Sequence, residues 1–78
     1  MLHPATLKIH LLIEFTTPET AVNLSETPFN PTQTLQQLED GAWRLEADMD
    51  DTVQLTGWIE AWRERGGFRK VEKTPIEA

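Results

Sequence analysis

An acidic run is the first feature of this 78-residue chain whose residue types could do chemistry. Glu46, Asp48, Asp50 and Asp51 lie close together in sequence, and magnesium sites use such carboxylates with water or phosphate completing the shell. However, the apolar–polar alternation over Trp43–Met49 directs Glu46 and Asp48 to solvent. An acid at position 50 or 51 is also suited to begin the helix that follows. We therefore expect solvated carboxylates and no metal site.

The two histidines, His3 and His10, give little support for a metal site elsewhere. Three or four ligands must converge on a bound zinc ion, and the chain has no paired histidine motif and no cysteine. The lack of cysteine also excludes a thiolate nucleophile and a disulfide framework. His10 is expected on the solvent face of a strand, beside Lys8 and Glu14. We expect no cofactor.

Four cations near the C-terminus, Arg63, Arg65, Arg69 and Lys70, form the candidate interaction surface. They could contact an anion or a nucleic acid, because Lys and Arg side chains neutralise phosphate charge. Three glutamates are interleaved with them, which favours a solvated surface of mixed charge. No nucleophile, base and orienting group converge anywhere in the sequence. We therefore assign no catalytic or cofactor-binding residue and do not expect an enzyme.

The three tryptophans could form a stacking platform, but their spacing favours core packing. Trp43 lies on the apolar side of an alternating segment, and Trp58 and Trp62 lie on one apolar helix stripe. The exposed face of the predicted sheet would carry no aromatic residue. Base stacking of the kind used by RNA-recognition modules is therefore not expected.

Composition points to one small domain without a membrane span. The net charge is −6, and residues 1–56 hold nine of the 13 acids but only Lys8 and Arg44 among the seven cations. Such a chain is a poor duplex-binding protein. The longest apolar run, Leu11 to Ile13, is too short for a membrane span or a signal peptide. A cytoplasmic location is the default expectation.

The first half of the chain predicts a strand and then a short helix. Residues 7–15 alternate strictly between apolar and mostly polar side chains, which indicates a central strand with one buried face. Thr16-Thr17-Pro18-Glu19 then provides a hydroxyl cap, a proline in the first turn and an early acid. We expect a helix over about residues 18–25.

A hairpin and a second helix follow. The predicted arms are residues 33–38, a polar edge strand, and residues 43–49, a central strand. Asp40-Gly41 supplies the positive φ that a tight turn needs. Asp51 with Gln54 matches a capping box for a helix over about residues 52–65, which Gly66-Gly67 ends.

The last predicted strand covers residues 68–73. Phe68 and Val71 have opposite parity in it, so either a bulge intervenes or only one of them faces the core. The order strand, helix, strand, strand, helix, strand predicts an α+β, ferredoxin-like βαββαβ fold. It is a four-stranded antiparallel sheet with two helices on one face.

The ordered motifs resemble the C-terminal extension of bacterial WYL-domain transcriptional regulators, the module called WCX. The resemblance covers nearly the whole chain, including the opening strand and the Thr-Pro-Glu helix start. Each motif is a packing or turn signal, and their order carries the specificity. The matching positions are Phe29, Pro31 and Gln33, the Asp40-Gly41 turn, the strand Trp43–Met49, the helix residues Leu55, Trp58 and Ile59, and then Gly66, Val71 and Pro75.

The resemblance implies that residues 1–78 are the C-terminal fragment of a longer DNA-binding regulator. In such proteins an N-terminal winged helix-turn-helix contacts DNA, and a WYL domain senses a ligand. The C-terminal module packs on the WYL domain, commonly across a homodimer. The family's sensing residues lie in the WYL domain, so no functional residue is carried over to this chain.

Two functions from different classes remain open on the sequence. The first is a non-catalytic regulatory and dimerisation module of a bacterial, cytoplasmic transcription regulator. The second is an ACT-like domain that holds a small effector at an interface between a strand and a helix.

Overall fold

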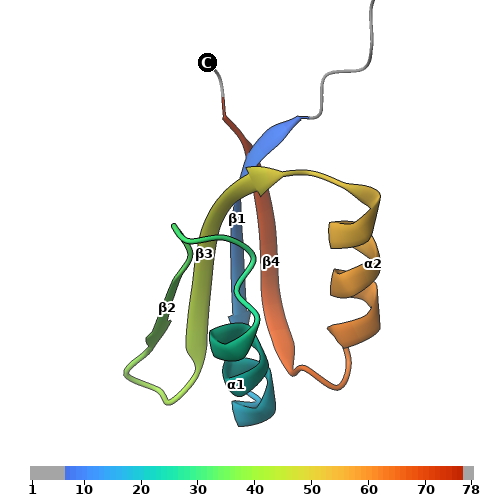
Figure 1. Ribbon diagram of the computed structural model, residues 1–78. Coiled ribbons are helices and arrows are strands. Elements are labelled where there is room, and N and C mark those ends of the chain that lie inside the picture. Colours follow the sequence, from blue (N-terminus) through green and yellow to red (C-terminus); the bar gives the residue numbers. More distant parts are fainter. Residues whose placement is uncertain (1–6, 77–78) are drawn as a thin grey trace, which may run out of the picture.

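A four-stranded antiparallel sheet carries two helices in the computed structural model, which describes residues 7–76 (Figure 1). The spatial order of the strands is β2-β3-β1-β4, with β1 and β3 in the centre. The predicted ferredoxin-like α+β fold is therefore confirmed. The elements are β1 (Lys8–Phe15), α1 (Pro18–Glu26), β2 (Thr34–Gln37), β3 (Trp43–Asp50), α2 (Val53–Trp62) and β4 (Phe68–Pro75).

The core lies between the central strands and the two helices. Alternate residues of β1 are fully buried on this side, and both helices add side chains to the same cluster, so they cover one face of the sheet as predicted. Burial of this apolar area is the main stabilising term of such a small domain. The buried cluster consists of Ile9, Leu11, Ile13 and Phe15 from β1, Leu45 from β3, Leu24 from α1, and Leu55 and Ile59 from α2.

Leu7 corrects the predicted start of the first strand. The expected range was 7–15, but β1 begins at Lys8 and the Leu7 side chain remains 52% exposed. The Leu7 backbone carbonyl accepts a 2.8 Å hydrogen bond from the Asp51 backbone N–H.

The hairpin turn forms where the sequence predicts it. Gly41 has a φ of 89°, and the Leu38 N–H donates to the Ala42 carbonyl at 2.7 Å. The edge arm is shorter than the predicted 33–38, because β2 has only four residues. Gln33, the first residue of the predicted arm, lies before β2, and its side chain binds the connector between α1 and β2.

Helix α1 begins at Pro18 as predicted, but no hydroxyl caps it. Thr17 occupies the N-cap position without a side-chain hydrogen bond. The neighbouring threonines bind the glycine loop after α2: the Thr16 backbone N–H donates to the Gly67 carbonyl at 3.0 Å, and the buried Thr20 hydroxyl donates to the Gly66 carbonyl at 3.0 Å. Thr16, which belongs to the predicted helix-start motif, therefore serves a contact with the loop after α2 instead of capping α1.

Helix α2 is capped by Thr52, which corrects the predicted capping role of Asp51. The Thr52 hydroxyl accepts a 3.1 Å hydrogen bond from the Leu55 N–H. Asp51 is not free for this role, because its backbone N–H donates to the Leu7 carbonyl and its carboxylate lies 2.9 Å from Lys73 Nζ.

The predicted second helix, residues 52–65, is too long by about a turn, because α2 ends at Trp62. The Gly66 N–H donates to the Trp62 carbonyl at 2.7 Å, and Gly67 has a φ of 67°, so the chain reverses toward β4. The strand β4 then extends to Pro75, beyond the predicted end at residue 73.

A register shift in β4 resolves the parity of its apolar residues. Phe15 pairs with Phe68, whereas Ile13 pairs with Val71, so one extra residue is accommodated in β4. Phe68 and Val71 consequently both pack against the core. Of the two predicted alternatives, the bulge is the one that forms.

The connector between α1 and β2 is fixed by residues that the family resemblance singles out. Gln33 accepts a 2.8 Å hydrogen bond from the Phe29 N–H through Oε1 and donates through Nε2 to the Leu24 carbonyl at 3.1 Å. The Phe29 ring meets Trp58 edge-on, with centroids 5.0 Å apart. Phe29 and Gln33 therefore hold the connector in place and pack it against α2.

Candidate functional site

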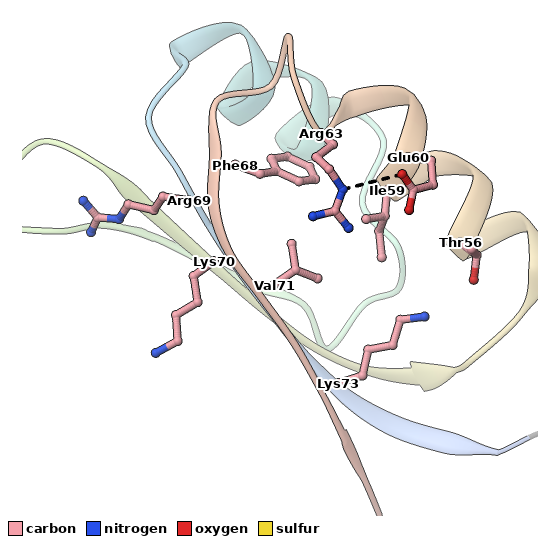
Figure 2. A pocket seen from close by; sticks show the side chains of 9 residues that line it. All are labelled: Thr56, Ile59, Glu60, Arg63, Phe68, Arg69, Lys70, Val71 and Lys73. Carbon is pink, nitrogen blue, oxygen red and sulfur yellow. Dashed lines mark ion pairs between the residues drawn. The ribbon is translucent and has the colours of Figure 1, made fainter.

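A groove between α2 and the edge strand β4 is a concave site within the described residues (Figure 2). It encloses about 310 Å³. Ile59 from α2 and Phe68 and Val71 from β4 give it an apolar floor, because the bulge places both β4 residues on the helix side of the sheet. The groove therefore combines a helix, a strand edge and an apolar surface.

Two cations lie at opposite ends of this floor, with Val71 between them (Figure 2). Arg63 follows the last residue of α2, and its Nε lies 3.5 Å from Glu60 Oε2 in an exposed ion pair. Lys73 extends from the helix side of β4 and pairs with Asp51 at 2.9 Å. Exposed pairs of this kind are weak, and both cations keep further N–H donors available.

The outer edge of β4 offers backbone groups as well. Within residues 7–76 this strand pairs only with β1, and the Ile76 N–H donates to the Lys8 carbonyl at 2.9 Å. In an antiparallel ladder the direction of the backbone groups alternates. Glu72 and Thr74 therefore direct their N–H and C=O groups to β1, whereas Val71 and Lys73 direct theirs away from the sheet.

The four predicted interaction cations do not form one surface. Only Arg63 points into the groove; the Arg65 guanidinium lies over the Trp62 ring, 4.2 Å from its centroid. Arg69 and Lys70 border the groove, but their side chains extend away from it (Figure 2). Lys70 Nζ lies 3.9 Å from Glu72 on the opposite face of the sheet.

Sequence reasoning missed Lys73 as the second cation of the groove. A usable signal was present: Lys73 is two residues from Val71, so both side chains lie on the same face of the strand. The unresolved parity of Phe68 and Val71 concealed which face that was.

On the opposite face of the sheet, Glu14 is the centre of a charge network. It is only 8% exposed, and it accepts hydrogen bonds from Arg44 Nη2 at 2.9 Å and from Arg69 Nε at 3.2 Å. Arg69 Nη1 also donates to Asp40 at 2.7 Å. The Arg44 and Arg69 guanidiniums hold the pKa of Glu14 below its ordinary value, and Arg69 does the same to the pKa of Asp40.

His10 is held between two carboxylates on this same face. Its Nδ1 lies 2.6 Å from Asp48 and its Nε2 lies 3.1 Å from Glu46. The hydrogen bond to Asp48, followed by that to Glu46, raises the pKa of His10 above 6.5. The side chain faces outward, as predicted, but it is engaged by two partners.

The acidic run at the end of β3 is thus divided among several basic side chains. Glu46 and Asp48 bind His10, Asp50 lies 4.0 Å from Lys8, and Asp51 binds Lys73. Between residues 7 and 76, no group of three His, Cys, Asp or Glu side chains is arranged to hold a metal ion.

The tryptophans lie in packed positions. Trp43 stacks on Phe15 with centroids 5.9 Å apart, and Trp58 contacts both Trp62 and Phe68 at 5.7 Å. Trp43 and Trp58 both pack against the buried cluster, which agrees with the predicted core role. Over the described part of the chain, no helix has the length and apolar character needed to cross a membrane.

Comparisons with family models, with curated proteins and with solved structures found no match to this chain.

Proposed function

We propose that this chain is a non-catalytic regulatory and dimerisation module of a cytoplasmic, WYL-type bacterial transcription regulator. In this proposal the chain is the C-terminal part of a longer protein. An N-terminal domain contacts DNA, a WYL domain senses the effector, and this module packs on the WYL domain within a homodimer.

The observation that carries the proposal is the combination of an uncovered strand edge with an apolar groove beside it. The outer edge of β4 is a surface that proteins usually cover, and the half-buried Phe68 and Val71 line the groove beside it over the buried Ile59. The charges on the other face of the sheet are largely paired with one another. A surface of another domain therefore fits the groove side best, and the ordered WCX-like motifs are the ground for the class of protein and for the homodimer.

Two observations test the proposal. The coding sequence upstream of this chain should encode a helix-turn-helix followed by a WYL domain, and a different architecture would remove the family assignment. Sedimentation equilibrium of the 78-residue chain should show concentration-dependent dimers. A strict monomer at high concentration would contradict the dimerisation part.

A second candidate is an ACT-like domain that binds a small effector. The groove supports it because it lies between a helix and a strand, and Arg63 and Lys73 suit a carboxylate or phosphate group. Its volume is at the lower end of ligand pockets, which span about 300–1,000 Å³. A thermal-shift screen of amino acids and nucleotides separates the two candidates, because a ligand that binds the folded state raises the melting temperature.

A further inference from the structure

We propose that the groove between α2 and β4 receives an extended, acidic segment of a partner domain as a fifth strand of the sheet. The segment has the pattern acid–x–apolar–x–acid. The inference rests on the proposed function, in that the module exists to contact another domain, and it names the chemistry of that contact.

The backbone of β4 provides the template for the added strand. The N–H and C=O groups of Val71 and Lys73 point away from β1, so they are available to pair with an incoming strand. The template is short, because Pro75 has no N–H to donate. An added strand can therefore use only a few residues of β4, which makes the adjacent side-chain contacts decisive.

The groove floor selects an apolar side chain at the centre of the segment. A strand beside β4 directs every second side chain to the helix side of the sheet. The side chain next to Val71 would lie over the apolar floor, between Phe68 and Ile59. A leucine, isoleucine or valine at that position would cover the exposed parts of Phe68 and Val71, which are half-buried in the free chain.

The two cations select acids on either side of the apolar residue. Arg63 and Lys73 lie at opposite ends of the floor, and only Glu60 among the groove residues has the opposite charge (Figure 2). Residues two positions before and after the central apolar residue also face the helix side. Carboxylates at those two positions would therefore meet one cation each.

Charge argues against two other occupants of this edge. A second copy of the chain, paired through its own β4, would bring together strands that each hold Arg69, Lys70 and Lys73 against Glu72 alone. Duplex nucleic acid would meet a chain of net charge −6, with no aromatic side chain on the open face of its sheet. A short acidic protein segment complements the cations of the groove and carries far fewer negative charges than a duplex.

The test is an NMR titration of the 78-residue chain with a capped peptide of the sequence glutamate–threonine–leucine–threonine–glutamate. We expect saturable shifts at Val71, Lys73 and Ile59. Arg63→Glu and Lys73→Glu should each weaken binding about tenfold or more, because like charges then face each other. Lys70→Glu is the matched control: it makes the same charge change on the same strand, but on the opposite face, and should leave the affinity within about twofold.

Modified peptides test the added-strand geometry without changing the protein. N-methylation of one alternate set of peptide amides should abolish binding, whereas methylation of the other set should be tolerated, since only one set faces β4. Tolerance of both sets would overturn strand addition. Equal binding of a peptide with lysine in place of glutamate would overturn the selection of acids.

Sedimentation of the same samples separates this inference from the proposed function. A dimeric chain that does not bind the peptide overturns the groove assignment alone. A monomeric chain that binds it contradicts the dimerisation part and supports the groove. If Arg63→Glu abolished self-association, a second copy of the chain would be the occupant of the groove. That result would overturn the proposal that an acidic segment of another domain binds there.

Discussion

Glu14 combines burial with charge, and its two arginine partners make that possible. A buried carboxylate is costly unless charged donors surround it, and Arg44 and Arg69 reach Glu14 from the two flanking strands. This network of side-chain hydrogen bonds therefore links β3 and β4 to β1. The alternation of β1 predicted that Glu14 faces away from the core, but long arginine side chains from other strands bury it, and a single-strand pattern does not contain that information.

Glu14→Gln should destabilise the chain at neutral pH and reduce its sensitivity to acid. The pKa of Glu14 is lowered from 4.5 in the folded state, so its contribution is present above pH 4.5 and is lost as the pH falls through the lowered value. Urea unfolding at several pH values measures this. Glu72→Gln, on the same face but exposed, is the control and should have little effect; equal effects of the two substitutions would contradict the network.

His10 should contribute stability in the opposite pH direction. Its folded-state pKa is raised above 6.5 by Asp48 and Glu46, so its contribution is fully present below pH 6.5 and disappears as the pH rises through the raised value. An NMR titration of the His10 ring checks this. Asp48→Asn should bring the pKa back toward 6.5, and a wild-type pKa at or below 6.5 would refute the interpretation.

At the scale of elements, neighbouring leucines of β1 should respond very differently to the same substitution. Leu11 is fully buried beneath the helices, whereas Leu12 faces the open side and is half-buried. Leu11→Ala should cost about 2–5 kcal/mol of unfolding free energy, as for other buried leucines, and Leu12→Ala roughly half of that or less. Chemical denaturation measures both values; comparable costs would mean that the assigned face is wrong.

Two glycines associated with α2 should give effects of opposite sign. A Cβ atom at Gly57 meets nothing within 4 Å, so Gly57→Ala should stabilise the helix by about 0.5–1 kcal/mol. At Gly66 a Cβ atom would lie 2.5 Å from the Trp62 carbonyl oxygen and 2.8 Å from the Phe68 ring, so Gly66→Ala should destabilise the chain by more than about 1 kcal/mol. Melting curves report both; stabilisation by Gly66→Ala would contradict the close turn.

The elements themselves were largely predictable, whereas their ends were not. Strict alternation in residues 7–15 and 43–49 identifies the central strands, because burial of one face leaves a period of two in the sequence. The ends depend on tertiary partners: Thr52 rather than Asp51 caps α2, since Lys73 binds Asp51. The helix also ends early at Trp62, because the glycine loop must reach Thr16 and Thr20.

At the scale of the whole molecule, the Glu14 and His10 charge networks and the groove lie on opposite faces of the sheet. The open sheet face carries the Glu14 and His10 networks, whereas the β4 edge and its groove keep backbone and side-chain groups available. The sequence identified the cations near the C-terminus but did not show which of them share a face of the sheet. Two features of the structure decide this. The bulge in β4 places Lys73 on the helix side of the sheet, and Arg69 extends to Glu14 and Asp40 instead of into the groove.

Amide hydrogen exchange along β4 tests the central claim most directly. In the free chain, the Val71 and Lys73 amides should exchange quickly and those of Glu72 and Thr74 slowly, because only the latter pair with β1. Saturation with the acidic peptide should slow Val71 and Lys73 selectively. Unchanged exchange at Val71 and Lys73 in the presence of bound peptide would contradict the account, because the peptide would then not lie along this edge.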